Sequence, residues 1–212
     1  MQPKKFALNN VYTGQQMINL NVNEIFYSLQ GEGGRQGEAS IFIRLTGCNL
    51  HCDFCDTDFE TGKAMTLEAL HTIILQYPCR WIVWTGGEPT LQLTDEVLYF
   101  FKKKGYKQAV ESNGTQKLSA VFDYTVLSPK GCHWASAKQL NPQVDEVRLP
   151  VREQDELPEV EALPQAKNYF LSPIFALNEV ETQHNINYCV VQILKRPQWR
   201  LSVQIHKLIG IQ

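Results

Sequence analysis

Short apolar runs recur along the 212-residue chain at spacings typical of strands, and they constrain its fold more than any other feature. Helical patterns lie between several runs. One follows Thr66 and ends at Pro78, another extends from Thr94 to Gly105, and a third covers residues 179–194. Strands separated by helices pair in parallel through right-handed crossovers. We therefore predict an α/β fold with strands at residues 22–26, 41–45, 81–84, 108–110, 124–127, 146–149, 169–171 and 201–205.

Polar clusters follow several predicted strands at their carboxyl ends. They are residues 85–89, 111–115 and 128–130, Ser172 with Pro173, and Gln204 with His206. In barrel-type α/β folds these ends converge on one mouth, where ligands bind, so the clusters predict one large site. We expect an incomplete, modified (βα)6-type barrel, a partial TIM barrel with a core of about six parallel strands. The connections after Ser128 resemble loops, so helices are expected to be missing in the C-terminal half.

Three cysteines, Cys48, Cys52 and Cys55, follow the spacing C-x3-C-x2-C. A structural zinc site would need a fourth ligand, either His51 or a distant residue. An iron–sulfur cluster also usually takes four cysteines, so three would leave one iron open to a ligand from outside the protein. Isolated cysteines are more often small buried residues than ligands, which is the prediction for Cys79, Cys132 and Cys189.

Composition excludes several classes of partner. The net charge of −2 gives no basic excess for avid binding to a nucleic-acid backbone. The first residues lack the apolar stretch of a signal peptide, and no run is long enough to span a bilayer. We therefore expect a cytoplasmic protein with no nucleic-acid or membrane partner. Thiols stay reduced in that compartment, so clustered cysteines indicate metal or redox chemistry rather than disulfides.

The cysteine loop, with Phe54 directly before its last cysteine, resembles the cluster loop of the radical S-adenosylmethionine (SAM) superfamily. Residues 86–89, Gly-Gly-Glu-Pro, match the superfamily's second signature, which contacts the methionine amino group of SAM. The resemblance implies a 4Fe–4S cluster on three cysteines, with SAM on the open iron. It also implies cleavage of SAM to a 5′-deoxyadenosyl radical that abstracts a hydrogen atom.

Other segments resemble 7-carboxy-7-deazaguanine synthases, from about residue 22 to the end. They are residues 23–33, 43–44, 55–57, 111–115, 128–130 and 197–211. The resemblance implies conversion of 6-carboxy-5,6,7,8-tetrahydropterin to 7-carboxy-7-deazaguanine with loss of ammonia, in queuosine or other deazapurine biosynthesis. The radical would take the hydrogen at C6, and the ring would contract. We treat residues 1–212 as one domain, with an uninterpreted extension at residues 1–20.

The resemblance also implies roles for individual residues. No side chain is expected to act as the catalyst, because the SAM-derived radical abstracts the hydrogen. The residues expected to bind SAM are Phe54, Gly86, Gly87, Glu88, Glu111, Ser112, Ser128, Pro129, Lys130 and Ser172. Those expected to bind the pterin are Leu29, Gln30, Gly31, Glu32, Arg44, Thr85, His206 and Gln212, the last through its main-chain carboxylate. Thr57 is expected to hold Mg²⁺, whose preferred ligands are oxygens. A flavodoxin- or ferredoxin-type electron donor and a homodimer complete the expected partners.

Alternatives remain at this point. A glycyl-radical activase would share the cysteine loop and the Gly-Gly-Glu-Pro turn, but would not explain residues 30–33 or the tail around His206. A zinc-binding module using the three cysteines and His51 would not explain the strand-end clusters. Arg44 could instead pair with a nearby acid, and Glu32 could be a solvated turn residue.

Overall fold

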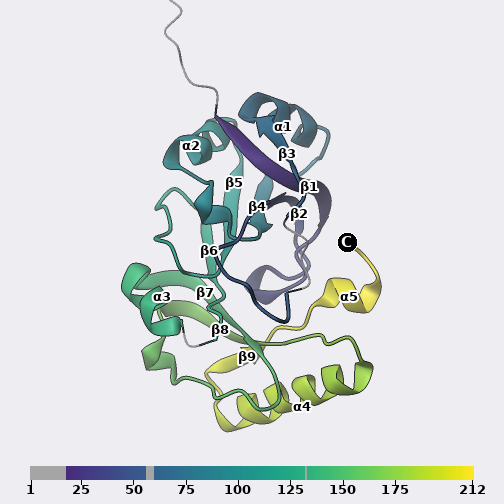
Figure 1. Cartoon of the computed structure of the whole chain (residues 1–212), viewed down its shortest axis with the longest axis vertical. Helices are drawn as coiled ribbons and strands as arrows, with labels where there is room; N and C mark the ends of the chain where they lie inside the picture. Colours follow the sequence, from purple (N-terminus) through teal and green to yellow (C-terminus); the bar gives the residue numbers. More distant parts are fainter. Residues whose placement is uncertain (1–17, 56–59, 132) are drawn as a thin grey trace, which may run out of the picture.

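The computed structural model describes residues 18–55, 60–131 and 133–212, and a single curved sheet organises them (Figure 1). Its nine strands are ordered β3-β1-β2-β4-β5-β6-β7-β8-β9. The strands are β1 (Asn19–Leu29), β2 (Ala39–Leu45), β3 (Lys63–Thr66), β4 (Trp81–Gly86), β5 (Lys107–Ser112), β6 (Tyr124–Leu127), β7 (Gln143–Val151), β8 (Gln165–Pro173) and β9 (Trp199–Leu201). The α-helices are α1 (Leu67–Ile74), α2 (Asp95–Lys103), α3 (Trp134–Leu140), α4 (Glu179–Lys195) and α5 (Ile205–Ile209). Short 3-10 turns occur at Gly33–Arg35, Pro89–Leu91 and Val160–Ala162.

The strand pairing makes the sheet an open barrel. From β2 to β9 every neighbouring pair is parallel and follows chain order. β1 instead pairs antiparallel with both β2 and β3. The connection from β1 to β2, residues 30–38, contains no α-helix, so β2 runs back alongside β1. The order of the described strands ends at β3 and β9, so the barrel is incomplete, as predicted. Figure 1 shows α1 and α2 together beside the N-terminal strands and α4 along β8 and β9.

Two helix predictions hold at the level of individual contacts. The Thr66 hydroxyl caps α1 by accepting a hydrogen bond from Ala69 N, and Thr94 caps α2 from Val97 N. Leu70 on α1 and Val97, Leu98 and Phe101 on α2 form the buried apolar faces of these helices. Trp84 packs edge-on against Phe101. Trp84 and Trp199 are buried packing residues, and Cys79 and Cys189 are buried too, whereas Cys132 lies outside the described residues.

Some element predictions were wrong. The last predicted strand, residues 201–205, is a strand only at Leu201, and Ile205 begins α5. Ser202 N still donates to Leu171 O, but Ile205 N donates to Gly31 O, so the chain leaves β8 for the β1–β2 turn. A helix, α3, occupies part of the region expected to be loops, and β3 was missed. Of the expected extension, residues 1–17 lie outside the described residues, while Asn19 and Leu20 belong to β1.

Among the described residues, no helix is both long and apolar enough to cross a bilayer.

Candidate functional site

A cavity of about 660 Å³ opens at the carboxyl ends of the parallel strands. The predicted site residues that line it are Leu29, Gln30, Gly31, Glu32, Arg44, Cys48, Cys52, Phe54, Cys55, Thr85, Gly86, Gly87, Glu111, Ser112, Ser128, Lys130, Ser172, His206 and Gln212. Glu88 and Pro129 lie outside the lining, and Thr57 falls outside the described residues. Most of the separate strand-end clusters therefore form one site, as the barrel prediction required.

The Gly86-Gly87 turn is bound tightly to the start of the cysteine loop. Gly86 has φ +124°, and a Cβ atom there would lie 2.1 Å from Leu45 O. A Cβ on Gly87 would lie 2.0 Å from Gly47 O. In this arrangement Gly87 N donates to Leu45 O at 3.1 Å and Glu88 N to Gly47 O at 2.8 Å. Only glycine allows the end of β4 to approach so closely, and the approach places the two sequence signatures side by side.

Glu88 supports the Gly86-Gly87 turn and does not line the cavity. Its side chain is fully buried. Oε1 accepts hydrogen bonds from Thr90 N and from the Thr90 and Ser112 hydroxyls, and Oε2 accepts from Asn113 N at 2.7 Å. The carboxylate thus ties the turn after β4 to the end of β5. The Ser112 hydroxyl, which also accepts from Gly114 N, is used in the same framework.

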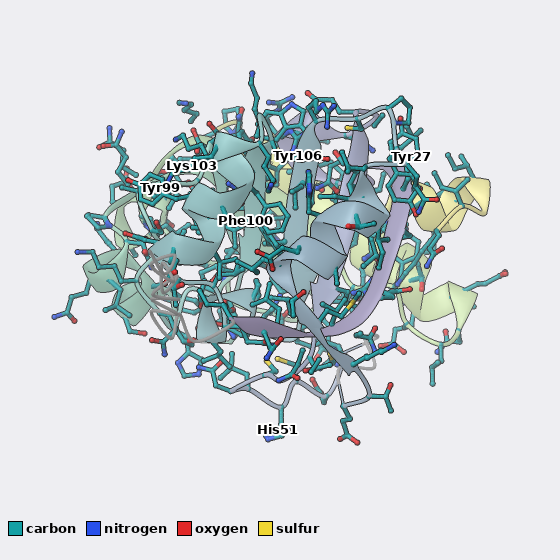
Figure 2. The ribbon with its side chains drawn as sticks, turned by 90° about the horizontal axis from the view of Figure 1, so that it is seen from above. Tyr27, His51, Tyr99, Phe100, Lys103 and Tyr106 are labelled. Atoms are coloured by element: carbon teal, nitrogen blue, oxygen red, sulfur yellow. The ribbon has the colours of Figure 1, made fainter. Side chains whose placement is uncertain are left out.

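The three loop cysteines are free thiols that line the cavity. Burial raises the pKa of Cys52, as do the neighbouring Cys48 and Cys55, while Lys130 acts in the opposite direction. No three metal-binding side chains in the described ranges converge tightly enough to hold one metal ion. His51 projects from the molecule at the tip of the loop (Figure 2), which does not suit a zinc site. Three spaced thiols facing a cavity fit a 4Fe–4S cluster, in which each cysteine binds a different iron.

A pair of basic residues flanks the cysteine loop. Lys130 Nζ donates to Ser128 Oγ at 2.8 Å and lies 5.8 Å from the Phe54 ring centroid. Burial lowers the pKa of Lys130, against the pull of Cys52 and nearby carboxylates. Arg152, just beyond β7, packs over Phe54 and pairs with Asp53 at 2.9 Å. Sequence reasoning missed Arg152, which joins the cysteine loop to the opposite side of the barrel.

A charged network forms the floor of the cavity, and its central residue, Arg148, was also missed. Arg148 is 6% exposed and forms ion pairs with Glu146 at 2.7 Å, Glu111 at 3.1 Å and Glu32 at 3.4 Å. Burial alone would lower the pKa of Arg148, but the three carboxylates outweigh it and raise the pKa. One signal was available in the sequence: Glu146 and Arg148 are two apart in the strand predicted at residues 146–149, so both side chains face the same way.

Gln30 and Ser172 support the two carboxylates that face the ligand space. Gln30 uses its main chain within the β1–β2 turn, since its N donates to Glu38 O and its O accepts from Gly37 N. Its side chain reaches the site instead, with Nε2 donating to Glu111 Oε1 and Oε1 accepting from Glu32 N. The Ser172 hydroxyl, expected to contact SAM, donates to Glu32 Oε1 at 2.7 Å.

The C-terminal tail passes through α5 and ends near β1 (Figure 1), and its residues His206 and Gln212 line the cavity. His206 packs on Gly31, where a Cβ would lie 2.0 Å from His206 Nδ1. The Ser28 hydroxyl donates to Gln212 O, and Gln212 Nε2 donates to a carboxylate oxygen of Glu24 at 2.8 Å.

The same Glu24 carboxylate accepts from Arg44 Nε at 2.6 Å. Arg44 therefore pairs with a nearby acid, which was the alternative to substrate binding, and it also lines the cavity.

Comparisons with known proteins agree with this geometry. Residues 42–125 match the Radical SAM superfamily. The 7-carboxy-7-deazaguanine synthase of Bacteroides thetaiotaomicron is 39% identical over 191 residues, which is 90% of this chain and 98% of that protein. The enzyme of the same name from Haemophilus influenzae is 36% identical, over 92% of this chain and 95% of that protein. The crystal structure of QueE from Escherichia coli is similar with a TM-score of 0.66 and 24% identity, over 88% of this chain and 94% of that chain. The predicted partial barrel is thereby confirmed as the radical SAM fold.

Proposed function

This chain belongs to the family of 7-carboxy-7-deazaguanine synthases, radical SAM enzymes, and we propose that its cavity performs the family's reaction through the residues described above. The substrate would be 6-carboxy-5,6,7,8-tetrahydropterin and the products 7-carboxy-7-deazaguanine and ammonia. One observation supports this most: a single cavity is lined by three thiols, a Gly-Gly turn, an acid-rich floor and the C-terminal tail. A zinc module has no use for the floor or the tail.

On the cofactor side, Cys48, Cys52 and Cys55 would hold the cluster. When bound, the cluster and SAM supply the radical that removes one hydrogen atom from the substrate. The protein's contribution is to bind and orient. Main-chain groups of Gly86 and Gly87 border the space for the methionine part. Ser128 and Lys130, which are hydrogen-bonded to each other, provide a hydroxyl and a cation after the end of β6.

On the substrate side, the chemistry of the lining suits both ends of a carboxypterin. The Glu32 carboxylate and the Gln30 amide can accept hydrogen bonds from the guanidine-like edge. Arg44 would bind the substrate carboxylate, with Glu24 holding its Nε in place. Leu29, Gly31, Thr85, His206 and Gln212 would enclose the ring and limit entry of water.

Further components of the reaction remain proposals. We place Mg²⁺ at Thr57, where a hydroxyl, waters and the substrate carboxylate would form an oxygen-only set. An external one-electron donor must reduce the cluster. We also propose that the protein forms a homodimer. We propose a reducing, cytoplasmic setting, because thiols that ligate a cluster must stay reduced.

Anaerobic turnover tests the proposal. Reconstituted protein receives SAM, a reductant, Mg²⁺ and 6-carboxytetrahydropterin, and products are read by mass spectrometry. We expect 7-carboxy-7-deazaguanine without stoichiometric 5′-deoxyadenosine, because SAM is regenerated. Cleavage of SAM with the pterin untouched would contradict the substrate assignment and favour another radical SAM activity, such as a glycyl-radical activase.

A further inference from the structure

Arg148 occupies a place in the cavity that no part of the proposed reaction has yet used. It projects from the middle of β7 into the barrel, and it is almost fully buried. The guanidinium Nε and one terminal nitrogen donate to Glu146 Oε1, at 2.9 and 2.7 Å. These two bonds fix the plane of the guanidinium group. The other terminal nitrogen is thereby directed toward the ligand space.

That second nitrogen, Nη1, faces two carboxylates from different parts of the chain. It donates to Glu111 Oε2 at 3.1 Å and lies 3.4 Å from Glu32 Oε2. Glu111 comes from the end of β5, on the side proposed to hold SAM. Glu32 comes from the turn after β1, on the side proposed to bind the pterin. One donor therefore lies between the two halves of the site.

Glu146 anchors this network, because hydrogen bonds hold both of its carboxylate oxygens in place. Its Oε2 accepts from Gly34 N at 2.8 Å and from the Tyr124 hydroxyl at 2.9 Å, while Oε1 receives the two bonds from Arg148. The carboxylates of Glu32 and Glu111 both line the cavity. Each could therefore replace its interaction with Arg148 by a hydrogen bond to a ligand. The network thus has a rigid end and a ligand-facing end.

We propose that Arg148 is a positioning residue that holds Glu32 and Glu111 in the orientation required for pterin binding, and so links the substrate side of the cavity to its cofactor side. This inference rests on the proposed function. A planar, permanently charged fork suits the task, because it can serve an anchor and two further carboxylates at once. An ammonium group at the same place would lack that geometry.

Charge gives the proposal a second observable. The groups that face Glu111 are Arg148, Glu146, Glu32 and Lys130. Burial raises the pKa of Glu111, and Arg148 counteracts part of that rise. Without Arg148, Glu111 would keep its proton to higher pH and lose acceptor strength. The acid limb of the pH profile should therefore move upward when the positive charge is removed.

The test compares Arg148→Gln and Arg148→Lys with Arg200→Gln as the matched control. Arg200 is an exposed arginine on β9 that donates to Asn168 Oδ1 and lies outside the cavity lining. Two readouts are taken. The first is the Kd for 6-carboxypterin, an oxidised and unreactive analogue, measured by fluorescence with cluster- and SAM-loaded protein and no reductant. The second is the pH profile of kcat/KM for the tetrahydropterin.

We expect both variants to weaken 6-carboxypterin binding about tenfold or more, a change typical of losing one charged hydrogen bond. Only Arg148→Gln should shift the acid limb, since lysine keeps the charge. If Arg148→Gln does not fold, the increase in Kd for Arg148→Lys at an unchanged melting temperature decides the question.

Wild-type-like binding and pH profiles in folded Arg148 variants would overturn the inference and leave the proposed function intact. A wild-type protein that neither binds nor converts pterins would overturn both.

Discussion

At the scale of single residues, the buried side chain of Glu88 has a structural role in the turn after β4. Its two carboxylate oxygens each accept from a main-chain N–H, Thr90 N on Oε1 and Asn113 N on Oε2. Both oxygens are therefore required. An isosteric amide has one acceptor and one donor end, so in either orientation one buried N–H loses its partner.

Glu88→Gln should accordingly destabilise the protein by about 1–3 kcal/mol, the usual effect of an unpaired buried donor. Urea unfolding of the variant measures this, and binding of SAM to the reconstituted protein reports on the rim. Glu156→Gln, on the exposed connection after β7, is the matched control. Equal stability and equal SAM binding in the two variants would show that Glu88 has no such structural role.

Arg44 is a second case in which a residue's neighbours decide its role. It lies between the cavity and Glu24, which also accepts from Gln212 Nε2. We expect Arg44→Lys to raise KM for the pterin more than it lowers kcat, because a point charge cannot form a bidentate pair with the substrate carboxylate. Steady-state kinetics measures the changes in KM and kcat separately. A lowered kcat at constant KM would contradict a ground-state binding role.

At the scale of elements, the site depends on how closely the loops after β2 and β4 approach each other. A methyl group on Gly87 would overlap Gly47 O and reach within 3.0 Å of Cys48 Cβ. Gly87→Ala should therefore displace the cysteine loop and lower the iron and sulfide content after reconstitution.

Gly105→Ala is the control for that change. Gly105 has a positive φ, +82°, and a Cβ there would meet nothing within 4 Å. Gly105→Ala therefore carries a backbone penalty of about 1–2 kcal/mol without any overlap. Gly87, whose φ is not positive, carries the overlap instead. If the two variants retained equal cluster content, the close approach would not matter for the cluster.

Local sequence was enough to predict some elements and not others. The cysteine loop, the Gly-Gly turn and the capped helices α1 and α2 are each encoded within a few adjacent residues. Leu201, Val203 and Ile205 alternate like a strand, but Ile205 N bonds Gly31 O in the β1–β2 turn, a partner far away in the chain. Arg148 was missed for the same reason: its contacts are with Glu32 and Glu111, which only the folded chain brings together.

At the scale of the whole molecule, the barrel is left open between β3 and β9, and the tail after β9 closes the cavity on that side. Ile205, His206 and Gln212 all contact the β1 region, through Gly31, Ser28 and Glu24. The last segment of the chain therefore completes a wall that the first strand begins. The two halves of the open barrel meet through this tail rather than through strand pairing.

This arrangement predicts that the position of an affinity tag matters. A tag joined to Gln212 would have to start within the cavity lining, so we expect kcat/KM to fall by about tenfold or more through displacement of substrate-facing groups. The same tag joined to Met1 is the control, and cluster absorbance should be equal in both proteins. Gln212→Ala, which removes only the hydrogen bond that the Gln212 side-chain amide donates to Glu24, should lower kcat/KM less than the C-terminal tag. Full activity in the C-terminally tagged protein would show that the tail covers the cavity without taking part in substrate binding.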